Sequence, residues 1–261
     1  MATSQHQTVQ EQFTRTAEAF AKFATRDTPD VLAERVAFAE LSPGDALLDV
    51  ACGAGAFTLA AAPRVRFARG VDLTAEMLRH AREAQRAHGV ENAAFDRAEG
   101  EHLPYAAASF DFVTCQFAFH HMPRPDEVLR EMVRVTKPGG RVFLVDSVAP
   151  KDAAPFALHN HIERLRDPSH TTTLSLAQFR DLFAEQELTT LKEEICERPR
   201  SFNQWMLRAG HPPSDASYRA ARAAMEGSIA GDRAGFKVQV RGDDLAIVHD
   251  EGLFLLKKNA A

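Results

Sequence analysis

The sequence is short of cysteine, of clustered basic residues and of long apolar runs. Its only cysteines, Cys52, Cys115 and Cys196, are odd in number and widely spaced, which excludes a disulfide framework and is typical of a reducing compartment. Its 31 lysines and arginines are outnumbered by 36 aspartates and glutamates and form no basic block, so we expect no nucleic-acid partner. The N-terminal stretch lacks an apolar signal core, and no later run could span a bilayer. We therefore expect a cytoplasmic protein without membrane insertion.

Composition and length set the scale of the fold. Apolar residues make up 45% of the sequence and charged residues 26%, which is ordinary for a globular protein with a sizeable core. We expect one domain over residues 1–261, because a chain of this length suits one large domain. Its parts are N-terminal helices (1–40), a core (41–150), an inserted region (151–243) and closing strands (244–258).

Strand-like and helix-like segments alternate through the first part of the chain. Short apolar runs predict strands, and apolar residues at helical spacing predict helices. Such alternation is typical of right-handed crossovers and of a parallel sheet with helices on both faces, so we predict an α/β, Rossmann-like three-layer sandwich. The predicted helices are 6–25, 29–40, one from Gly55, 74–89 and 125–136, and the predicted strands are 46–50, 68–73, 93–98, 110–117 and 140–148.

The pattern changes after residue 150. Helical segments are predicted near 153–165, 176–185 and 201–229, with a strand at 188–197. Two final strands, 244–249 and 252–257, are predicted to meet at a turn formed by the sequence HDEG.

A glycine-containing turn, within LLDVACGAGAF (47–57), follows the first predicted strand. Ligands of open parallel sheets bind beyond the carboxyl ends of the strands. Asp49 closes this strand, and the small residues Ala51, Gly53 and Gly55 let a ligand lie against the backbone. A second acid, Asp72, closes the second strand, where it can accept hydrogen bonds from ribose hydroxyls. Either acid alone could be a strand-end or capping residue, but the pair beside a glycine turn predicts an adenosine-containing ligand.

The spacing of the glycines distinguishes among such ligands. The dinucleotide-binding fingerprint has a third glycine at its sixth position, and that position is Thr58 here. Asp49 would also repel a pyrophosphate, whereas it could hold an ammonium group. These features favour a ligand with a cationic amino-acid end, S-adenosyl-L-methionine (SAM), over a dinucleotide.

The ordered motifs of residues 47–148 resemble those of class I SAM-dependent methyltransferases. Besides the glycine turn, the motifs are GVDLTAEMLRHARE, RAEGEHLPY, SFDFVTCQFAFHHM and VTKPGGRVFLV. The resemblance is greatest to the subgroup similar to the ubiquinone/menaquinone-biosynthesis (type 11) methyltransferases, although Ala51 and Ala54 stand where glycine and threonine are commoner. It implies a seven-stranded, mostly parallel sheet with a reversed last strand at 252–257 and a helical lid from the inserted region.

The resemblance also implies roles for individual residues. Asp72 would bind the ribose, Leu73 and Met77 would border the adenine, Glu99 would bind the adenine amino group, and the Gly100 backbone would contact a ring nitrogen. The complete set expected at the SAM site is Asp49, Ala51, Gly53, Gly55, Asp72, Leu73, Met77, Glu99, Gly100 and Gln116.

Aromatic side chains are candidates for the walls of an acceptor site, since methyl transfer needs orientation and exclusion of water. Phe117 and Phe119 follow the fourth predicted strand, at the rim of the sheet. Phe20 and Phe23 lie on an N-terminal helix that covers the cofactor in relatives, and ordinary core packing would explain them equally well. Trp205, in SFNQWMLRAG (201–210), could cap the acceptor or anchor the insertion.

Histidines and one arginine are the polar candidates around the acceptor. His120 and His121 follow the fourth strand, and either could act as a base or hold a loop carbonyl. A second polar cluster, HNHIERLRDPSHTT (159–172), contains His170, a third catalytic candidate, and Arg166, which could pair with an acidic acceptor or with nearby carboxylates. The histidines of this cluster have no carboxylate or thiolate at ligand spacing, so we expect no metal.

The sequence thus predicts SAM-dependent methyl transfer to a small-molecule acceptor, aromatic or acidic, with S-adenosyl-L-homocysteine (SAH) as product. Two alternatives stay open. One is a SAM-binding protein that does not methylate, which would have the same pocket. The other is an NAD-dependent oxidoreductase, which needs the missing glycine and a hydride-chemistry pair such as Tyr-Lys; Tyr105 and Tyr218 are the only tyrosines. The acceptor atom and the oligomeric state are not predicted.

Overall fold

The computed structural model describes residues 5–24 and 29–259, with the side chains of residues 19–24 and 29 outside that description. Its strands are β1 (Ala46–Val50), β2 (Phe67–Asp72), β3 (Ala93–Arg97), β4 (Phe110–Gln116), β5 (Thr136–Ser147), β6 (Leu188–Ser201), β7 (Gln239–Arg241) and β8 (Asp244–Lys258). Its α-helices are α1 (Gln5–Ala24), α2 (Pro29–Phe38), α3 (Ala56–Ala61), α4 (Ala75–Ala87), α5 (Pro125–Val135), α6 (Ala153–Arg166), α7 (Leu176–Glu185), α8 (Phe202–Arg208) and α9 (Ala216–Ser228), with 3-10 helices η1 (Ala62–Arg64) and η2 (Phe119–His121).

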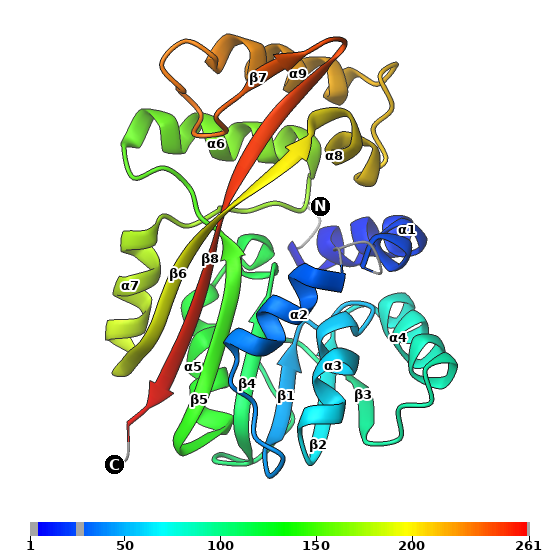
Figure 1. Cartoon of the computed structure of the whole chain (residues 1–261), viewed down its shortest axis with the longest axis vertical. Helices are drawn as coiled ribbons and strands as arrows, with labels where there is room; N and C mark the ends of the chain where they lie inside the picture. The colour runs from blue at the N-terminus through cyan, green and yellow to red at the C-terminus, as the bar shows by residue number, and fades with distance from the viewer. Residues whose placement is uncertain (1–4, 25–28, 260–261) are drawn as a thin grey trace.

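The strands form one sheet in the order β3-β2-β1-β4-β5-β8-β6, with β7 paired to β8 (Figure 1). The pairs among β1 to β5 are parallel, whereas β8 runs antiparallel to both β5 and β6. Every residue of the central strand β1 is buried, as expected for a parallel strand with helices on both faces. The predicted α/β, Rossmann-like fold with a reversed last strand is confirmed, and β7 is a strand beyond the seven-stranded sheet that the resemblance implies.

Separate apolar clusters fill the two faces of the sheet. On one face, α5 and α7 pack residues such as Leu129 and Phe179 against β4, β5 and β8. On the other face, α2 and α3 pack Val36 and Phe57 against Phe143 of β5. The sheet therefore lies between two helical layers, and the carboxyl ends of its parallel strands meet at one edge.

The predicted turn at HDEG is wrong, because β8 continues through it as one 15-residue strand. β6 pairs with β8 from Leu188, opposite Lys258, to Ser201, opposite Ala246, so both strands extend beyond the central sheet. Two of the three polar residues of HDEG, His249 and Glu251, are buried and bound to other elements. A polar sequence of this kind usually predicts an exposed turn. Here it lies in a strand that passes from the central sheet to the layer above it, with His249 and Glu251 buried.

Above the sheet, β6 and β8 lead into a layer formed by α6, α8, α9 and β7, which we call the lid (Figure 1). The lid has its own apolar cluster, which includes Phe202, Trp205, Tyr218 and Phe236. The predicted helical region 201–229 is two helices, because the chain turns at Gly210, whose φ is +88°, before Pro212 and Pro213. None of the described helices combines the length and apolarity needed to cross a bilayer.

Candidate active site

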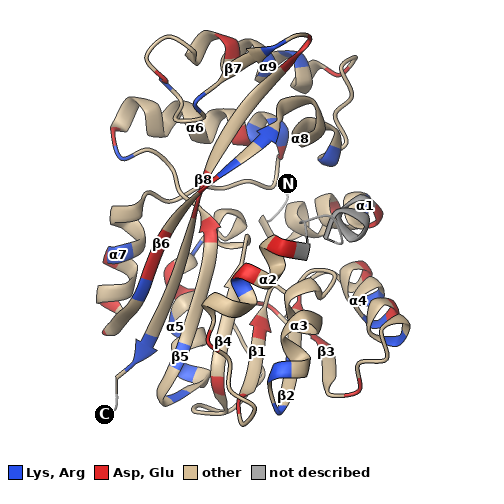
Figure 2. Cartoon of the chain, in the orientation of Figure 1, with Lys and Arg blue, Asp and Glu red and all other residues tan. Residues whose placement is uncertain are grey.

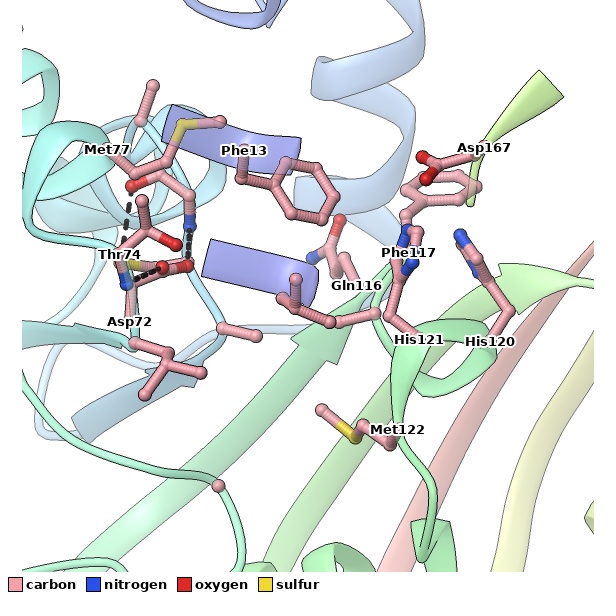
Figure 3. Close-up of a pocket in the computed structure, with 18 of the residues that line it drawn as sticks. Phe13, Asp72, Thr74, Met77, Gln116, Phe117, His120, His121, Met122 and Asp167 are labelled. Carbon is pink, nitrogen blue, oxygen red and sulfur yellow. Dashed lines mark hydrogen bonds between the residues drawn. The ribbon is translucent and has the colours of Figure 1, made fainter. Parts of the chain in front are cut away.

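A cavity of about 380 Å³ begins at the carboxyl ends of β1, β2 and β4 and is also lined by residues of α1, α2 and the lid. Asp72, Thr74 and Met77 gather at one end of the view in Figure 3, and His120 and His121 lie at the other. We call these the Asp72 end and the His120 end. This is the position at which open parallel sheets bind ligands.

The glycine turn places its backbone on the cavity. Ala51 and Gly53 line the cavity with φ angles of +56° and +54°, and a Cβ atom on Gly53 would meet no protein atom within 4 Å. Gly55 has a different role, since a Cβ there would lie 2.8 Å from the Phe95 ring. Gly55 is therefore needed for packing at the start of α3 and does not line the cavity, whereas Ala51 and Gly53 do.

Asp72 holds the turn in place. Its carboxylate accepts hydrogen bonds from the Gly53 amide at 2.9 Å and from the Thr74 amide at 2.8 Å. Burial raises the pKa of Asp72, although these hydrogen bonds act in the opposite direction. Asp72 lines the cavity, and the two backbone hydrogen bonds fix the position of its carboxylate.

Asp49 is buried beside Asp72. One carboxylate oxygen accepts a hydrogen bond from Thr58 Oγ1 at 2.6 Å. Burial raises the pKa of Asp49 to about 7, and the nearby charge of Asp72 adds to the effect. Among the described residues no basic side chain pairs with this carboxylate, so a cationic ligand group would be favoured beside it.

Leu73, Met77, Glu99 and Gly100 complete the Asp72 end, as all four line the cavity. The Glu99 side chain is 46% exposed and lies 3.9 Å from His6 Nδ1. His6 lies on α1 and also contacts the buried Glu101 at 3.2 Å. Helix α1 therefore covers this end of the cavity.

His120 and Asp146 form a close pair at the opposite end. His120 Nδ1 lies 2.5 Å from Asp146 Oδ1, and the Asp146 carboxylate also accepts a hydrogen bond from the His120 amide at 3.3 Å. Burial alone would lower the pKa of His120, but the Asp146 charge and hydrogen bond outweigh it, so the pKa is raised. With Nδ1 held by a carboxylate, Nε2 is the ring nitrogen that can act on a ligand.

The other two histidine candidates differ from His120. His121 Nδ1 lies 3.2 Å from the Ser169 carbonyl and 3.0 Å from its hydroxyl, and burial lowers the His121 pKa to about 4. His121 lines the cavity as a neutral ring. His170 does not line the cavity: its Nε2 lies 2.9 Å from the Asn160 side-chain oxygen, and burial lowers its pKa to about 3. His170 therefore packs next to His120, at 5.5 Å between ring centroids, and we interpret it as a structural residue.

Comparisons with known proteins identify the family of this chain. A family model described as a methyltransferase domain matches residues 48–144. YcgJ, a methyltransferase of Bacillus subtilis, is 38% identical over 166 residues, which cover 64% of this chain and 66% of YcgJ. The crystal structure of YcgJ superposes with a TM-score of 0.80 at 30% identity, covering 88% of this chain and 98% of that one. This chain belongs to the SAM-dependent methyltransferases.

A second relative extends the comparison. The demethylmenaquinone methyltransferase of Bacillus cytotoxicus is 33% identical over 120 residues, which cover 45% of this chain and 51% of that protein. The chain thus matches about half to two thirds of the length of these curated relatives. The cofactor of this methyltransferase is SAM, and the family match decides against an NAD-dependent oxidoreductase.

The Asp72 end of the methyltransferase fits SAM. The Gly53 backbone faces open space that a Cβ atom would enter, as close approach of a ligand requires. Asp49 and Asp72 are buried carboxylates with raised pKa values, which suits a ligand that brings a positive charge. Leu73 and Met77 supply the apolar contacts that a nucleobase needs.

The structure brings some of the predicted acceptor residues to the cavity and not others. Phe117, Arg166 and Trp205 line it, as does Gln116, which was predicted for the SAM site. Phe119 does not, because η2 turns its ring into the apolar cluster of α5. The side chains of Phe20 and Phe23 lie outside the described residues.

Several cavity residues were missed from the sequence. Asp146, which holds the cavity residue His120, lies one residue before the end of β5, as Asp49 does in β1, so the same strand-end argument would have found it. The lid residues approach the cavity from α6, β6, α8 and β8; Glu163 and Asp167 fall within the polar cluster 159–172, whereas no sequence signal marks Arg200, Arg208 or His249. The missed residues that line the cavity from outside the glycine motifs include His6, Phe13, Arg35, Glu163, Asp167, Arg200, Arg208 and His249.

Proposed function

We propose that this methyltransferase transfers a methyl group from SAM to a small-molecule acceptor, aromatic or acidic, bound at the His120 end of the cavity. The observation that carries the proposal is that His120, which is held by Asp146, lines the same cavity as the Asp72 turn. A histidine held by a carboxylate on one nitrogen is suited to receive a proton on the other.

Residues of the Asp72 end would hold the cofactor. By the resemblance to relatives, Asp72 would bind the ribose, Leu73 and Met77 would contact the adenine ring, and Glu99 would bind the adenine amino group. The raised pKa of Asp49 supports an ammonium group as its partner. When bound, SAM supplies a methyl group on a positively charged sulfur, a centre that needs no metal to be reactive.

The protein's main contribution would be orientation and exclusion of water. Holding two reactants in line can lower a barrier by roughly 7–11 kcal/mol in favourable cases. Phe13 and Phe117 are aromatic groups that could wall the cavity, and Phe13 lies between its two ends (Figure 3). The Arg35 guanidinium lies 4.6 Å from the centroid of the Phe117 ring and holds it in place by a cation–π contact.

His120 would act as the base when the acceptor must lose a proton. Asp146 fixes the ring and stabilises the imidazolium that forms, as the raised pKa of His120 indicates. General-base assistance of this kind contributes typically about 10²–10⁴-fold in rate. His121, neutral and hydrogen-bonded to Ser169, would serve as a wall.

Release of SAH tests the proposal. Purified protein is incubated with SAM and panels of phenols, hydroxy acids, carboxylates and amines, and SAH is measured by mass spectrometry. We expect SAH with at least one hydroxyl-bearing acceptor, and a loss of about 10²-fold or more in His120→Gln at unchanged SAM affinity. SAM binding without SAH from any panel would support the alternative of a SAM-binding protein that does not methylate.

A further inference from the structure

A tight turn directly after α6 places a buried carboxylate at the His120 end of the cavity. The sequence DPSH (167–170) is typical of a β-turn, with aspartate at the first position and proline at the second. The His170 amide donates to the Asp167 carbonyl at 3.0 Å and closes the turn. Asp167 is 3% exposed and lines the cavity. In Figure 3 its carboxylate lies at the His120 end, on the same side as His121.

One oxygen of this carboxylate is used within the turn. Asp167 Oδ1 accepts hydrogen bonds from the Ser169 amide at 2.9 Å and from the Ser169 hydroxyl at 2.6 Å. Burial acts to raise the pKa of Asp167, but the neighbouring His121 and the hydrogen bonds from Ser169 outweigh it. The pKa of Asp167 is therefore lowered, and the carboxylate is ionised at neutral pH.

The hydrogen positions around Ser169 follow from this charge. An ionised carboxylate only accepts hydrogen bonds, so the Ser169 hydroxyl donates its one proton to Asp167. His121 Nδ1 lies 3.0 Å from the same hydroxyl oxygen and 3.2 Å from the Ser169 carbonyl, which also only accepts. Because the His121 pKa is lowered to about 4, the ring is neutral and has one proton. That proton is on Nδ1, and Nε2 carries a lone pair.

Two atoms of this group remain available to a ligand. Among the described residues, neither Asp167 Oδ2 nor His121 Nε2 has a hydrogen-bond partner. Protein atoms do not enclose either of them, so both are reachable from the cavity that their side chains line. Polar atoms of buried side chains are almost always paired, so we expect a ligand to supply hydrogen-bond donors here.

The charge of Asp167 limits the ligand groups that fit beside it. A carboxylate would be repelled, and a carbonyl or ether oxygen would bring its lone pairs against those of the protein. An ammonium group is less favoured than a neutral donor, because the Arg166 charge already acts on Asp167. Figure 2 shows both acidic (red) and basic (blue) segments on the side of the lid that faces the sheet. A hydroxyl group on an aromatic ring fits this position, since Phe117 and Trp205 line the same cavity.

We propose that Asp167 and His121 select a methyl acceptor that carries a second hydroxyl group on an aromatic ring. The hydroxyl that is methylated gives its proton to His120, and the second hydroxyl donates a hydrogen bond to Asp167 Oδ2, with His121 Nε2 beside it. Ser169 is a positioning residue, because its hydroxyl holds both Asp167 Oδ1 and His121 Nδ1. The assignment rests on the methyl-transfer function proposed above and narrows its acceptor to a dihydroxy-aromatic compound.

Binding to the SAH complex tests the proposal without methyl transfer. Protein saturated with SAH is titrated with phenol, the three benzenediols, their monomethyl ethers and the three hydroxybenzylamines, and the affinities are measured by ligand-observed NMR. We expect at least one benzenediol to bind about tenfold more tightly than phenol and than its own monomethyl ether, because each of these lacks a hydrogen bond to a charged group. The isomer that binds most tightly also reports the spacing of the two hydroxyl groups.

The decisive variant is Asp167→Asn. Ser169 donates twice to Oδ1, which keeps the amide oxygen at that position and turns the amide nitrogen toward the cavity. A donor then replaces the free acceptor, so the preference should invert, with the monomethyl ether binding at least as tightly as the diol. A variant that only loosened the turn would weaken all ligands together. The matched control is Asp152→Asn, at the exposed other end of α6, which should keep the preference of the wild type.

Three results would overturn the proposal. One is a preference for the diol that survives in folded Asp167→Asn. Another is a wild-type protein that binds no benzenediol more tightly than phenol at concentrations up to about 10 mM, and this result decides the matter even if the variant does not fold. The third is a hydroxybenzylamine that binds more tightly than every diol, which would assign an ammonium group to Asp167. The methyl-transfer function is measured separately, by SAH release from SAM on the same sample.

Discussion

Asp146 Oδ1 lies 2.5 Å from His120 Nδ1, and this pair joins the end of β5 to the short helix that follows β4. These strands are parallel neighbours, so their carboxyl ends meet at one edge of the sheet. A catalytic candidate on one strand end is thereby oriented by an acid on the next. The arrangement depends on the topology of the sheet rather than on any local sequence motif.

We expect the His120–Asp146 pair to be visible in the titration of His120. Because the Asp146 charge is what raises the His120 pKa against burial, Asp146→Asn should bring that pKa below the ordinary histidine value. Histidine-selective NMR from about pH 4 to about pH 9 measures the His120 pKa directly, without a methyl acceptor. The control Asp126→Asn, at an exposed position of α5, should leave the titration unchanged. A His120 pKa that does not move in Asp146→Asn would contradict the pairing.

SAM affinity should depend on pH through Asp49. The Asp49 pKa is raised to about 7, so at pH 6 most of this carboxylate is protonated and its attraction for an ammonium group is lost. We expect SAM to bind about fivefold or more weakly at pH 6 than at pH 7.5, with proton release on binding. Calorimetry in buffers of different ionisation enthalpy measures both effects. In Asp49→Asn the affinity should be low and independent of pH over this interval.

The ionised Asp49 carboxylate should lower the free energy of unfolding of the ligand-free protein. The pKa of Asp49 is higher in the folded than in the unfolded protein, so folding favours the protonated carboxyl. The free energy of unfolding therefore falls as pH rises from about 4 to about 7, because the buried group must ionise. Asp49→Asn keeps an acceptor for Thr58 and should raise the free energy of unfolding at pH 8 by about 1–3 kcal/mol. At pH 4 the variant should differ little from the wild type. Equal effects at both pH values, from denaturant unfolding curves, would show that the charge is not responsible.

Glu251 should be important for stability, because it joins α2 to the β6–β8 crossing. Its carboxylate is 2% exposed and lies 3.2 Å from Arg35 and 3.4 Å from Arg198. Glu251→Gln removes the negative charge between two guanidinium groups and should lower the free energy of unfolding by about 3 kcal/mol. The control Glu197→Gln, a 63% exposed carboxylate on the same strand pair, should cost less than about 1 kcal/mol. Similar losses in the two variants would contradict the account.

The sequence predicted the sheet well because its signals are local. The apolar runs of β1 and β4 and the strand-end acids Asp49 and Asp72 are recognisable within a few residues. Those signals also placed the glycine turn and most of the Asp72 end. Gly55 was the exception, since its contact with the Phe95 ring depends on a strand about forty residues away.

The lid could not be predicted in the same way. HDEG is typical of a turn in sequence, but the segment pairs with β6, and its His249 and Glu251 are buried against Glu163 and Arg35, from helices far away in sequence. Long-range side-chain contacts of this kind leave no periodic pattern in a single sequence. Phe119 was misplaced for a related reason, as a three-residue helix decides which way its ring turns.

The central claim is that the Asp72 turn and the His120 pair belong to one cavity that holds SAM. Calorimetric titration of SAM into the wild type and Asp72→Asn tests it most directly. Losing the charge of a buried carboxylate that binds a ligand costs about 1.5–3 kcal/mol, so the dissociation constant should rise at least about tenfold. The exposed Glu83→Gln on α4 is the control and should bind SAM as the wild type does. A folded Asp72→Asn protein with unchanged SAM affinity would contradict the account.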